Sequence, residues 1–293
     1  MTPTGTRVGE RAADAIGVFD SGVGGLSVLR ALRAELPLEK FVYVADSGHA
    51  PYGERDDAHV IARSHAIARY LVEQHHIKAL VVACNTATAA AIKLLRQDFA
   101  ALPVVGIEPA LKPAALSSKT GVIGVLATRG TLNSEKFQAL LASLHGQARF
   151  MLQPCDGLAD AIERGDTTKT IASCAAGTGA MGPFGQQPGA MDTLVLGCTH
   201  YPFATDTLRA LVGEHVAFLE GGAPVARQTR RLLAERGWLA QVPTLPATIA
   251  PPFFGTTGDA NNMRLAVQRW LHVDAQVQTL QIHSALQPAS SNP

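Results

Sequence analysis

Two short stretches decide the fold: Leu80-Val81-Val82-Ala83-Cys84-Asn85-Thr86 and Leu194-Val195-Leu196-Gly197-Cys198-Thr199-His200. Each begins with an apolar run that is too short for a helix, which predicts a buried strand. Each run ends at a cysteine, and a helical pattern follows. A cysteine at the carboxyl end of a parallel strand lies in the crevice where open α/β sheets bind ligands. The two cysteines therefore predict one crevice that is approached from two sides.

A second pair of stretches repeats in the same way. Ile16-Gly17-Val18-Phe19-Asp20 resembles Ile123-Gly124-Val125-Leu126-Ala127. Ile16 and Ile123 are 107 positions apart (123 − 16), and Cys84 and Cys198 are 114 apart (198 − 84). The similar offsets indicate a duplicated half-domain, although buried strands can also look alike by chance.

The rest of the chain alternates between predicted strands and predicted helices. Strands are expected at 16–19, 41–45, 79–83, 103–107, 121–126, 148–152, 193–196, 216–219 and 253–256. Helices are expected at 26–36, 60–75, 86–99, 133–144, 224–236 and 261–271, and 156–181 is expected to be mostly helical. This alternation predicts an α/β fold with parallel sheets flanked by helices. Residues 1–14, the tail after residue 281 and the Gly/Pro/Gln loop at 182–189 lack such a pattern and are expected to be flexible or variable.

Composition limits the class of protein. A chain of 293 residues with 47% hydrophobic and 17% charged residues fits a soluble globular protein of about two domains. The net charge of +1 does not indicate a nucleic-acid partner. No apolar run approaches the ~18 residues of a membrane span. Residues 1–14 lack the apolar segment of a secretory signal, so we expect a cytoplasmic protein with reduced thiols.

The remaining signals argue against common cofactor sites. None of the four cysteines forms a C-x-x-C pair, so neither a structural zinc site nor a thioredoxin motif is expected, and Cys155 and Cys174 are interpreted as incidental. In the turn at 20–25, the third glycine of a dinucleotide fingerprint would fall on Ser27, and no P-loop lysine follows. The turn still precedes a helix N-terminus, which favours an anion such as a carboxylate.

Two opposed thiols leave three chemical interpretations. They could be a redox pair, or one could be a nucleophile with His200 as its base, or both could act in two-base proton transfer. Inversion of a carbon centre requires removal of a proton from one face and addition of a proton to the other. A cysteine pKa near ~8.5 is close enough to neutrality for such general acid–base work.

The motifs together resemble those of the glutamate racemases, in the aspartate/glutamate racemase family. They are Phe19 to Leu26, then Asp46 with Pro51-Tyr52-Gly53, then Ala83 to Thr88, and then Gly197 to Phe203, in the family's order between about residues 15 and 260. The resemblance implies cofactor-independent interconversion of L- and D-glutamate by two cysteines, with D-glutamate used for peptidoglycan. No metal is expected.

The resemblance also implies two related α/β domains with the active site in the cleft between them. The second domain is inserted into the first. We therefore assign residues 15–113 and 217–281 to the first domain and 114–216 to the second, with a flexible lead at 1–14 and a flexible tail at 282–293.

The family's roles transfer to matching positions of this chain. Cys84 resembles the base that acts on D-glutamate and Cys198 the base that acts on L-glutamate. Asp20 and His200 resemble their helpers, and Glu108 is expected to tune the site. The expected substrate contacts are Asp20, Ser21, Pro51, Tyr52, Gly53, Asn85, Thr86, Thr128, Thr131, Thr199 and His200.

Simpler interpretations remain open for several of these residues. Asp20, Thr128 and Thr131 could be helix caps, Glu108 could be a plain strand end, and Tyr52 could be an aromatic at the rim. Aspartate or hydantoin racemase is the alternative activity, and a non-catalytic, two-lobed amino-acid-binding protein is a further one. Glutamate is the expected partner, with neither nucleic acid nor membrane, and a homodimer is a possible assembly.

Overall fold

The computed structural model describes residues 11–241 and 250–284. In this part of the chain the first sheet has six parallel strands in the order β10-β9-β2-β1-β3-β4. The strands are β1 (Ile16–Asp20), β2 (Phe41–Ala45), β3 (Ala79–Val82), β4 (Val104–Gly106), β9 (Phe253–Thr256) and β10 (Val277–Thr279). The first four were expected from their short apolar runs, and β1 and β2 are buried at every position.

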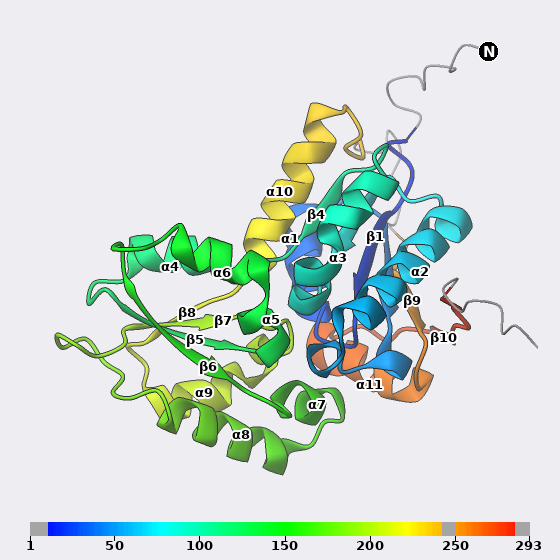
Figure 1. The fold of residues 1–293 in the computed structure, drawn as a ribbon. Helices are drawn as coiled ribbons and strands as arrows, with labels where there is room; N and C mark the ends of the chain where they lie inside the picture. The colour runs from blue at the N-terminus through cyan, green and yellow to red at the C-terminus, as the bar shows by residue number, and fades with distance from the viewer. Residues whose placement is uncertain (1–10, 242–249, 285–293) are drawn as a thin grey trace, which may run out of the picture.

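Helices cover both faces of this sheet. One face packs against α1 (Leu26–Glu35), α10 (Gly222–Glu235) and α11 (Ala260–Leu271). The other packs against α2 (Asp57–His75) and α3 (Asn85–Asp98). Because α10 and α11 come from the C-terminal third of the chain, the chain returns to its first unit after building the second (Figure 1).

The second sheet has four parallel strands in the order β6-β5-β7-β8. They are β5 (Val122–Ala127), β6 (Arg149–Pro154), β7 (Thr193–Leu196) and β8 (Ala217–Leu219). One face packs against α7 (Leu158–Glu163), α8 (Thr167–Gly179) and α9 (Thr205–Val212), and the other against α4 (Leu111–Ser117) and α6 (Glu135–Ala142). A short helix, α5 (Arg129–Asn133), follows β5.

Each sheet contains the same four-strand order. The run β2-β1-β3-β4 of the first sheet corresponds to β6-β5-β7-β8 of the second. The repeated stretches occupy equivalent places, since Ile16 and Ile123 lie in β1 and β5, while Cys84 and Cys198 follow β3 and β7. This is the arrangement that a duplicated half-domain would produce, and the expected α/β fold with two parallel sheets is confirmed.

Several details differ from the sequence-based expectations. Strand β8 pairs with β7, so residues 217–219 lie in the second sheet, beyond the expected boundary at residue 216. Helices α4 and α5 and strand β10 were not expected because each is short and its apolar pattern is brief, whereas α9 is the helical pattern expected after Cys198. In the expected flexible lead, residues 11–14 form a turn in which the Asp14 amide donates to the Arg11 carbonyl. In the expected tail, Ile282 packs against the core beneath α2 and α3. The expectations for residues 1–10 and 285–293 lie outside the described residues.

Candidate active site

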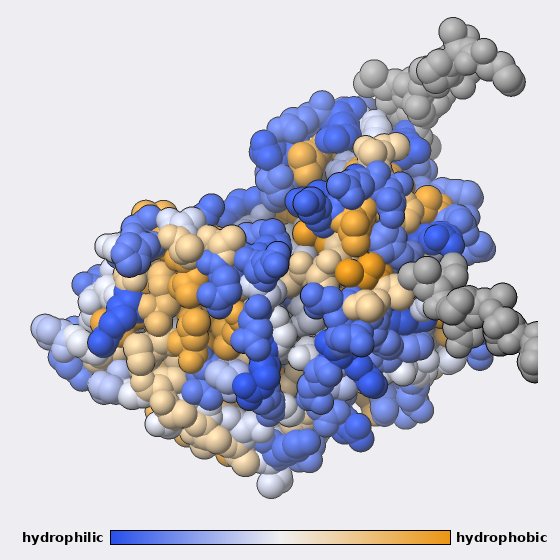
Figure 2. All heavy atoms as spheres, in the orientation of Figure 1, coloured by the Kyte–Doolittle hydropathy of each residue, from blue (hydrophilic) through white to orange (hydrophobic). Residues whose placement is uncertain are grey.

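A pocket opens between the two units at the carboxyl ends of both sheets. It encloses about 680 Å³ of empty space, including the part open to solvent. Ser21, Tyr52 and Cys84 line it from the first unit, and Thr128 and Cys198 line it from the second. Both cysteines therefore reach one crevice from opposite units, as their strand-end positions predict. Figure 2 shows hydrophilic residues along much of the boundary between the units on that face.

Cys84 is the residue at which β3 passes into α3. Its sulfur accepts the Ala87 amide at 3.4 Å, which caps the helix, and it lies 3.6 Å from the Ser21 hydroxyl. Burial, with the nearby charge of Asp20, raises the pKa of the Cys84 thiol to about 12. The protein surroundings alone therefore favour the neutral thiol, and a positive charge brought by a substrate ammonium would favour the thiolate.

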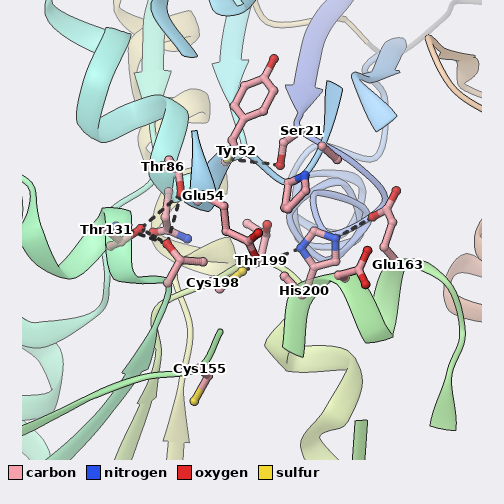
Figure 3. Close-up of a pocket in the computed structure, with 18 of the residues that line it drawn as sticks. Ser21, Tyr52, Glu54, Thr86, Thr131, Cys155, Glu163, Cys198, Thr199 and His200 are labelled. Atoms are coloured by element: carbon pink, nitrogen blue, oxygen red, sulfur yellow. Dashed lines mark hydrogen bonds and ion pairs between the residues drawn. The ribbon is translucent and has the colours of Figure 1, made fainter. Parts of the chain in front are cut away.

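Cys198 begins a chain of polar contacts through His200 to Glu163 (Figure 3). The Cys198 sulfur lies 3.8 Å from His200 Nδ1, and His200 Nε2 lies 2.7 Å from Glu163 Oε2. Burial lowers the pKa of His200, but its contacts with Cys198 and Glu163 outweigh burial and hold that pKa well above its usual value. The pKa of Glu163 is also affected by burial, which raises it, yet the hydrogen bond from His200 brings it below the usual value. The pair is an imidazolium facing a carboxylate, and the imidazolium lies beside the Cys198 sulfur.

Glu163 also connects the two units, and its role was not predicted. It lies at the end of α7, in the weakly patterned segment 156–181. Its carboxylate accepts the Val23 amide at 2.8 Å and the Ser47 hydroxyl at 2.7 Å, both from the first unit. The glycine turn at 20–25 was expected to bind an anion, and the anion it binds is this side chain.

Asp20 lies at the end of β1 and is fully buried. One carboxylate oxygen accepts the Gly22 amide at 2.8 Å, and the other accepts the Thr199 hydroxyl of the second unit at 3.0 Å. Burial is the largest effect on its pKa and raises it to about 6. Asp20 does not cap α1, which begins at Leu26 without a side-chain cap. Its carboxyl group therefore titrates close to neutrality, near enough to Cys84 for its charge to raise the pKa of that thiol.

Three threonine hydroxyls from both units meet on one wall of the pocket. Thr86 Oγ1 lies 3.2 Å from Thr128 Oγ1 and 3.5 Å from Thr131 Oγ1, and the last two lie 3.0 Å apart. Thr128 also accepts the Thr131 amide at 3.2 Å, so the expected alternative of a helix cap holds for Thr128 as well. Hydroxyl groups clustered in this way can donate to a carboxylate.

Asn85 adds a further polar group. Among the described residues, its Oδ1 atom has no hydrogen-bond partner although it is buried. Asn85 also lines the pocket. A buried acceptor without a partner is costly, so a donor from a bound molecule would stabilise the site.

Pro51, Tyr52 and Gly53 form another part of the wall. Tyr52 is buried, not at the rim, and its hydroxyl donates to Asp46 Oδ2 at 2.6 Å. Figure 3 shows the hydroxyl directed away from the other labelled pocket residues, so the ring is the part that faces the site. A Cβ on Gly53 would lie 2.9 Å from the Thr128 Cβ, so this loop fits closely against the second unit.

The structure differs from the sequence-based expectations at Glu108 and at Cys155. Glu108 does not line this pocket, and it forms an ion pair with Lys136 at 2.5 Å on a half-exposed surface. The expected tuning role of Glu108 therefore has no contact to support it. Cys155, interpreted as incidental, does line the pocket, and burial raises the pKa of its thiol to about 12.

The remaining expected residues lie together. Ser21, Thr199 and His200 line the pocket, whereas the predicted residue Asp20 is fully buried and does not line it. In residues 11–241 and 250–284, no group of three or more His, Cys, Asp and Glu side chains is placed to hold a metal ion. Within the same ranges, no helix is long and apolar enough to cross a membrane.

Comparison with known proteins identifies the class. Residues 25–229 match the family model described as Asp/Glu/Hydantoin racemase. The chain belongs to this family. It is 45% identical to a glutamate racemase of Cupriavidus pinatubonensis over 92% of this chain and 96% of that protein. It is 47% identical to a glutamate racemase of Ectopseudomonas mendocina over 89% of this chain and 96% of that protein.

Solved structures give the same result. A glutamate racemase of Escherichia coli, in complex with L-glutamate and the activator UDP-MurNAc-Ala, matches with a TM-score of 0.78 at 30% identity, over 92% of this chain and 99% of that chain. The RacE1 isoform of Bacillus anthracis glutamate racemase matches with a TM-score of 0.77 at 32% identity, over 92% and 97%. The chain is therefore an amino-acid racemase, and its relatives over nearly the whole length are glutamate racemases.

Proposed function

We propose that this chain interconverts L- and D-glutamate by two-base proton transfer between Cys84 and Cys198, without a cofactor. The observation that carries the proposal is the presence of two thiols at equivalent strand ends, in one pocket and on opposite units. Relatives at 45% and 47% identity are glutamate racemases, which supports glutamate as the substrate.

The chemistry assigns one cysteine to each face of the α-carbon. A thiolate on one side removes the α-proton and becomes a thiol, which leaves a planar carbanion. The thiol on the other side delivers its proton and becomes a thiolate, so the product is the opposite enantiomer. By the resemblance, Cys84 acts on D-glutamate and Cys198 on L-glutamate.

Charged side chains lie near each of the two thiols. The charged His200 lies beside the Cys198 sulfur, and Glu163 keeps His200 charged. On the other side, burial raises the pKa of Cys84 most, and the charge of Asp20 raises it further. We assign Asp20 to the substrate ammonium, which would neutralise that charge and let Cys84 ionise.

The distal carboxylate is assigned to the hydroxyls of Thr86, Thr128 and Thr131, with Asn85 accepting from the substrate. Thr86 and Thr131 lie on the other side of the pocket from His200 (Figure 3). Aspartate is one methylene shorter and would not reach both ends of the pocket equally well. Supply of D-glutamate for peptidoglycan and a cytoplasmic location belong to the same proposal, and the four free cysteines fit a reducing compartment.

A chiral assay tests the proposal most simply. Purified protein is given L-glutamate, D-glutamate or L-aspartate without added cofactor, and the enantiomers are separated by chiral chromatography. We expect an equal mixture of glutamate enantiomers whether the reaction starts from L-glutamate or from D-glutamate, and far slower conversion of aspartate. Cys174→Ala is the matched control, since Cys174 is buried in the core of the second unit and does not line the pocket. Activity only after addition of pyridoxal phosphate or a metal, or equal kcat/KM for aspartate, would contradict the proposal.

A further inference from the structure

Asp46 is a fully buried carboxylate that holds the pocket wall from behind. It follows β2, and its oxygens accept hydrogen bonds from the Tyr52 hydroxyl at 2.6 Å and the Thr257 hydroxyl at 2.7 Å. Arg63 of α2 adds two more, from Nε at 2.9 Å and Nη2 at 2.8 Å. Burial raises the pKa of Asp46, but the hydrogen bonds from Arg63 and Tyr52 outweigh it and keep that pKa below its usual value. Asp46 is therefore a fixed anion whose position depends on Arg63.

The guanidinium of Arg63 is fixed in turn by residues near the end of the described chain. Its Nη1 atom donates to the Ile282 carbonyl at 2.7 Å and to the Ser284 hydroxyl at 3.2 Å. The Arg63 side chain is only 4% exposed. Each of its three nitrogens has a partner, so removal of residues 282–284 leaves the buried Nη1 donor without its partners, which is costly.

The loop that Asp46 holds through Tyr52 is also part of the pocket wall. Tyr52 and Gly53 line the pocket, and Gly53 packs against Thr128, which belongs to the threonine cluster. The Gly53 carbonyl also lies 3.1 Å from the place that a Cβ on Gly130 would occupy, so there is little free space between this loop and α5. A displacement of the loop would therefore change the distance between the two walls of the pocket.

We propose that Arg63 is a positioning residue for substrate binding, and that the backbone at Ile282–Ser284 completes its geometry. The order of contact is Ile282 to Arg63, then Asp46, then the Tyr52–Gly53 wall. The proposal rests on the proposed function only in taking glutamate as the substrate. It assigns a role to a chain segment that follows β10 and lies away from the pocket.

A pair of truncations tests the segment. One variant ends at Gln281 and the other at Ser284, so both lack residues 285–293 but only the first lacks Ile282–Ser284. We expect the shorter chain to raise KM for both enantiomers about tenfold, because misplacement by about 1 Å can cost up to about 10²-fold. We expect its kcat to change less than about threefold, since the groups that move protons stay in place. The longer variant should match the full chain.

Arg63→Lys tests the guanidinium itself, with Arg69→Lys on the exposed face of the same helix as the control. Lysine keeps the charge but not the bidentate geometry, so KM should again rise about tenfold while kcat stays within about threefold. Combining Arg63→Lys with the shorter truncation should add little, because both act on one group. Urea unfolding of every variant reports the effect on stability separately.

The outcomes are distinct. An unchanged KM in either Arg63→Lys or the shorter truncation, or a loss confined to kcat, would overturn the inference. Failure of both variants to fold would also overturn it, since the contacts would then serve only stability. If the full chain did not racemise glutamate, the proposed function would fail instead, whereas an active full chain with no KM difference would leave that function standing and reject the role of Arg63.

Discussion

Asp20→Asn should make the protein more stable at neutral pH while it removes activity. Asp20 is fully buried, and burial raises its pKa from 3.8 to about 6. One pKa unit corresponds to about 1.4 kcal/mol, so ionised Asp20 lowers the free energy of unfolding by about 3 kcal/mol above pH 6. Asparagine keeps an oxygen for the Gly22 amide but carries no charge, so it does not suffer this loss.

The sign follows from the order in which the two states release the proton. Below the unfolded pKa of 3.8, Asp20 is protonated in both states, so the folded protein carries no buried charge at this position and its free energy of unfolding is highest. Between about pH 4 and pH 6 the unfolded chain ionises first, so the stability of the wild type falls as pH rises. Above about pH 6, Asp20 is ionised in both states, and the stability that its neutral form gave to the folded protein is lost. The advantage of the variant should therefore grow with pH, by about 1.4 kcal/mol between pH 5 and pH 8.

Urea unfolding measured at a series of pH values checks this prediction. Asp274→Asn is the control, because Asp274 is exposed and lies outside the helices and strands. The stability difference between Asp20→Asn and the wild type should rise with pH, and that of the control should stay flat. A pH-independent difference, or one that falls with pH, would refute the assignment of a raised pKa to buried Asp20. Racemase activity should fall at least about 10²-fold, as expected for loss of a group in the acid–base machinery.

Three further predictions concern the two thiol neighbourhoods and the threonine wall. Glu163→Gln removes the charge that holds the pKa of His200 high, so the pH profile of kcat/KM should gain a new transition near neutrality; an unchanged profile would reject this pairing. Cys84→Ala and Cys198→Ala should each abolish racemisation in a chiral assay, because each removes the acid–base group of one face. Near wild-type activity in either variant would contradict two-base proton transfer. Thr131→Ala should raise KM for glutamate about tenfold, as expected for loss of one hydrogen bond to a charged group, and unchanged KM would remove Thr131 from the site.

The fold could be predicted because its strands have strong local signals. The runs before Cys84 and Cys198 are short, apolar and buried, and they occupy equivalent places in the two sheets. Strand β8 has only three residues and is partly exposed, so its pairing with β7 depends on the assembled sheet. For this reason the expected boundary of the second domain fell just before β8.

The candidate site was predicted less evenly. Most residues carried by motifs do line one pocket, but two do not: the Glu108 side chain pairs with Lys136 instead, and Asp20 is fully buried. Glu163 has no sequence signal, since its importance arises only when α7 meets the Val23 turn of the other unit. The same holds for Arg63 and Ile282, which are 219 positions apart and meet only in the folded chain. Local patterns therefore located the reactive groups, whereas the groups that hold them had to come from the structure.

Proton transfer in deuterated water tests the central claim most directly. The reaction starts from protiated L-glutamate in deuterated water, and both enantiomers are recovered at low conversion and analysed by mass spectrometry. If Cys198 removes the α-proton and Cys84 delivers one, the delivered hydrogen comes from a thiol that exchanges with solvent. The D-glutamate formed should then carry deuterium from the first turnover, while the remaining L-glutamate stays protiated. Deuterium entering recovered substrate as fast as product forms, or product that retains its original proton, would contradict the two-base account.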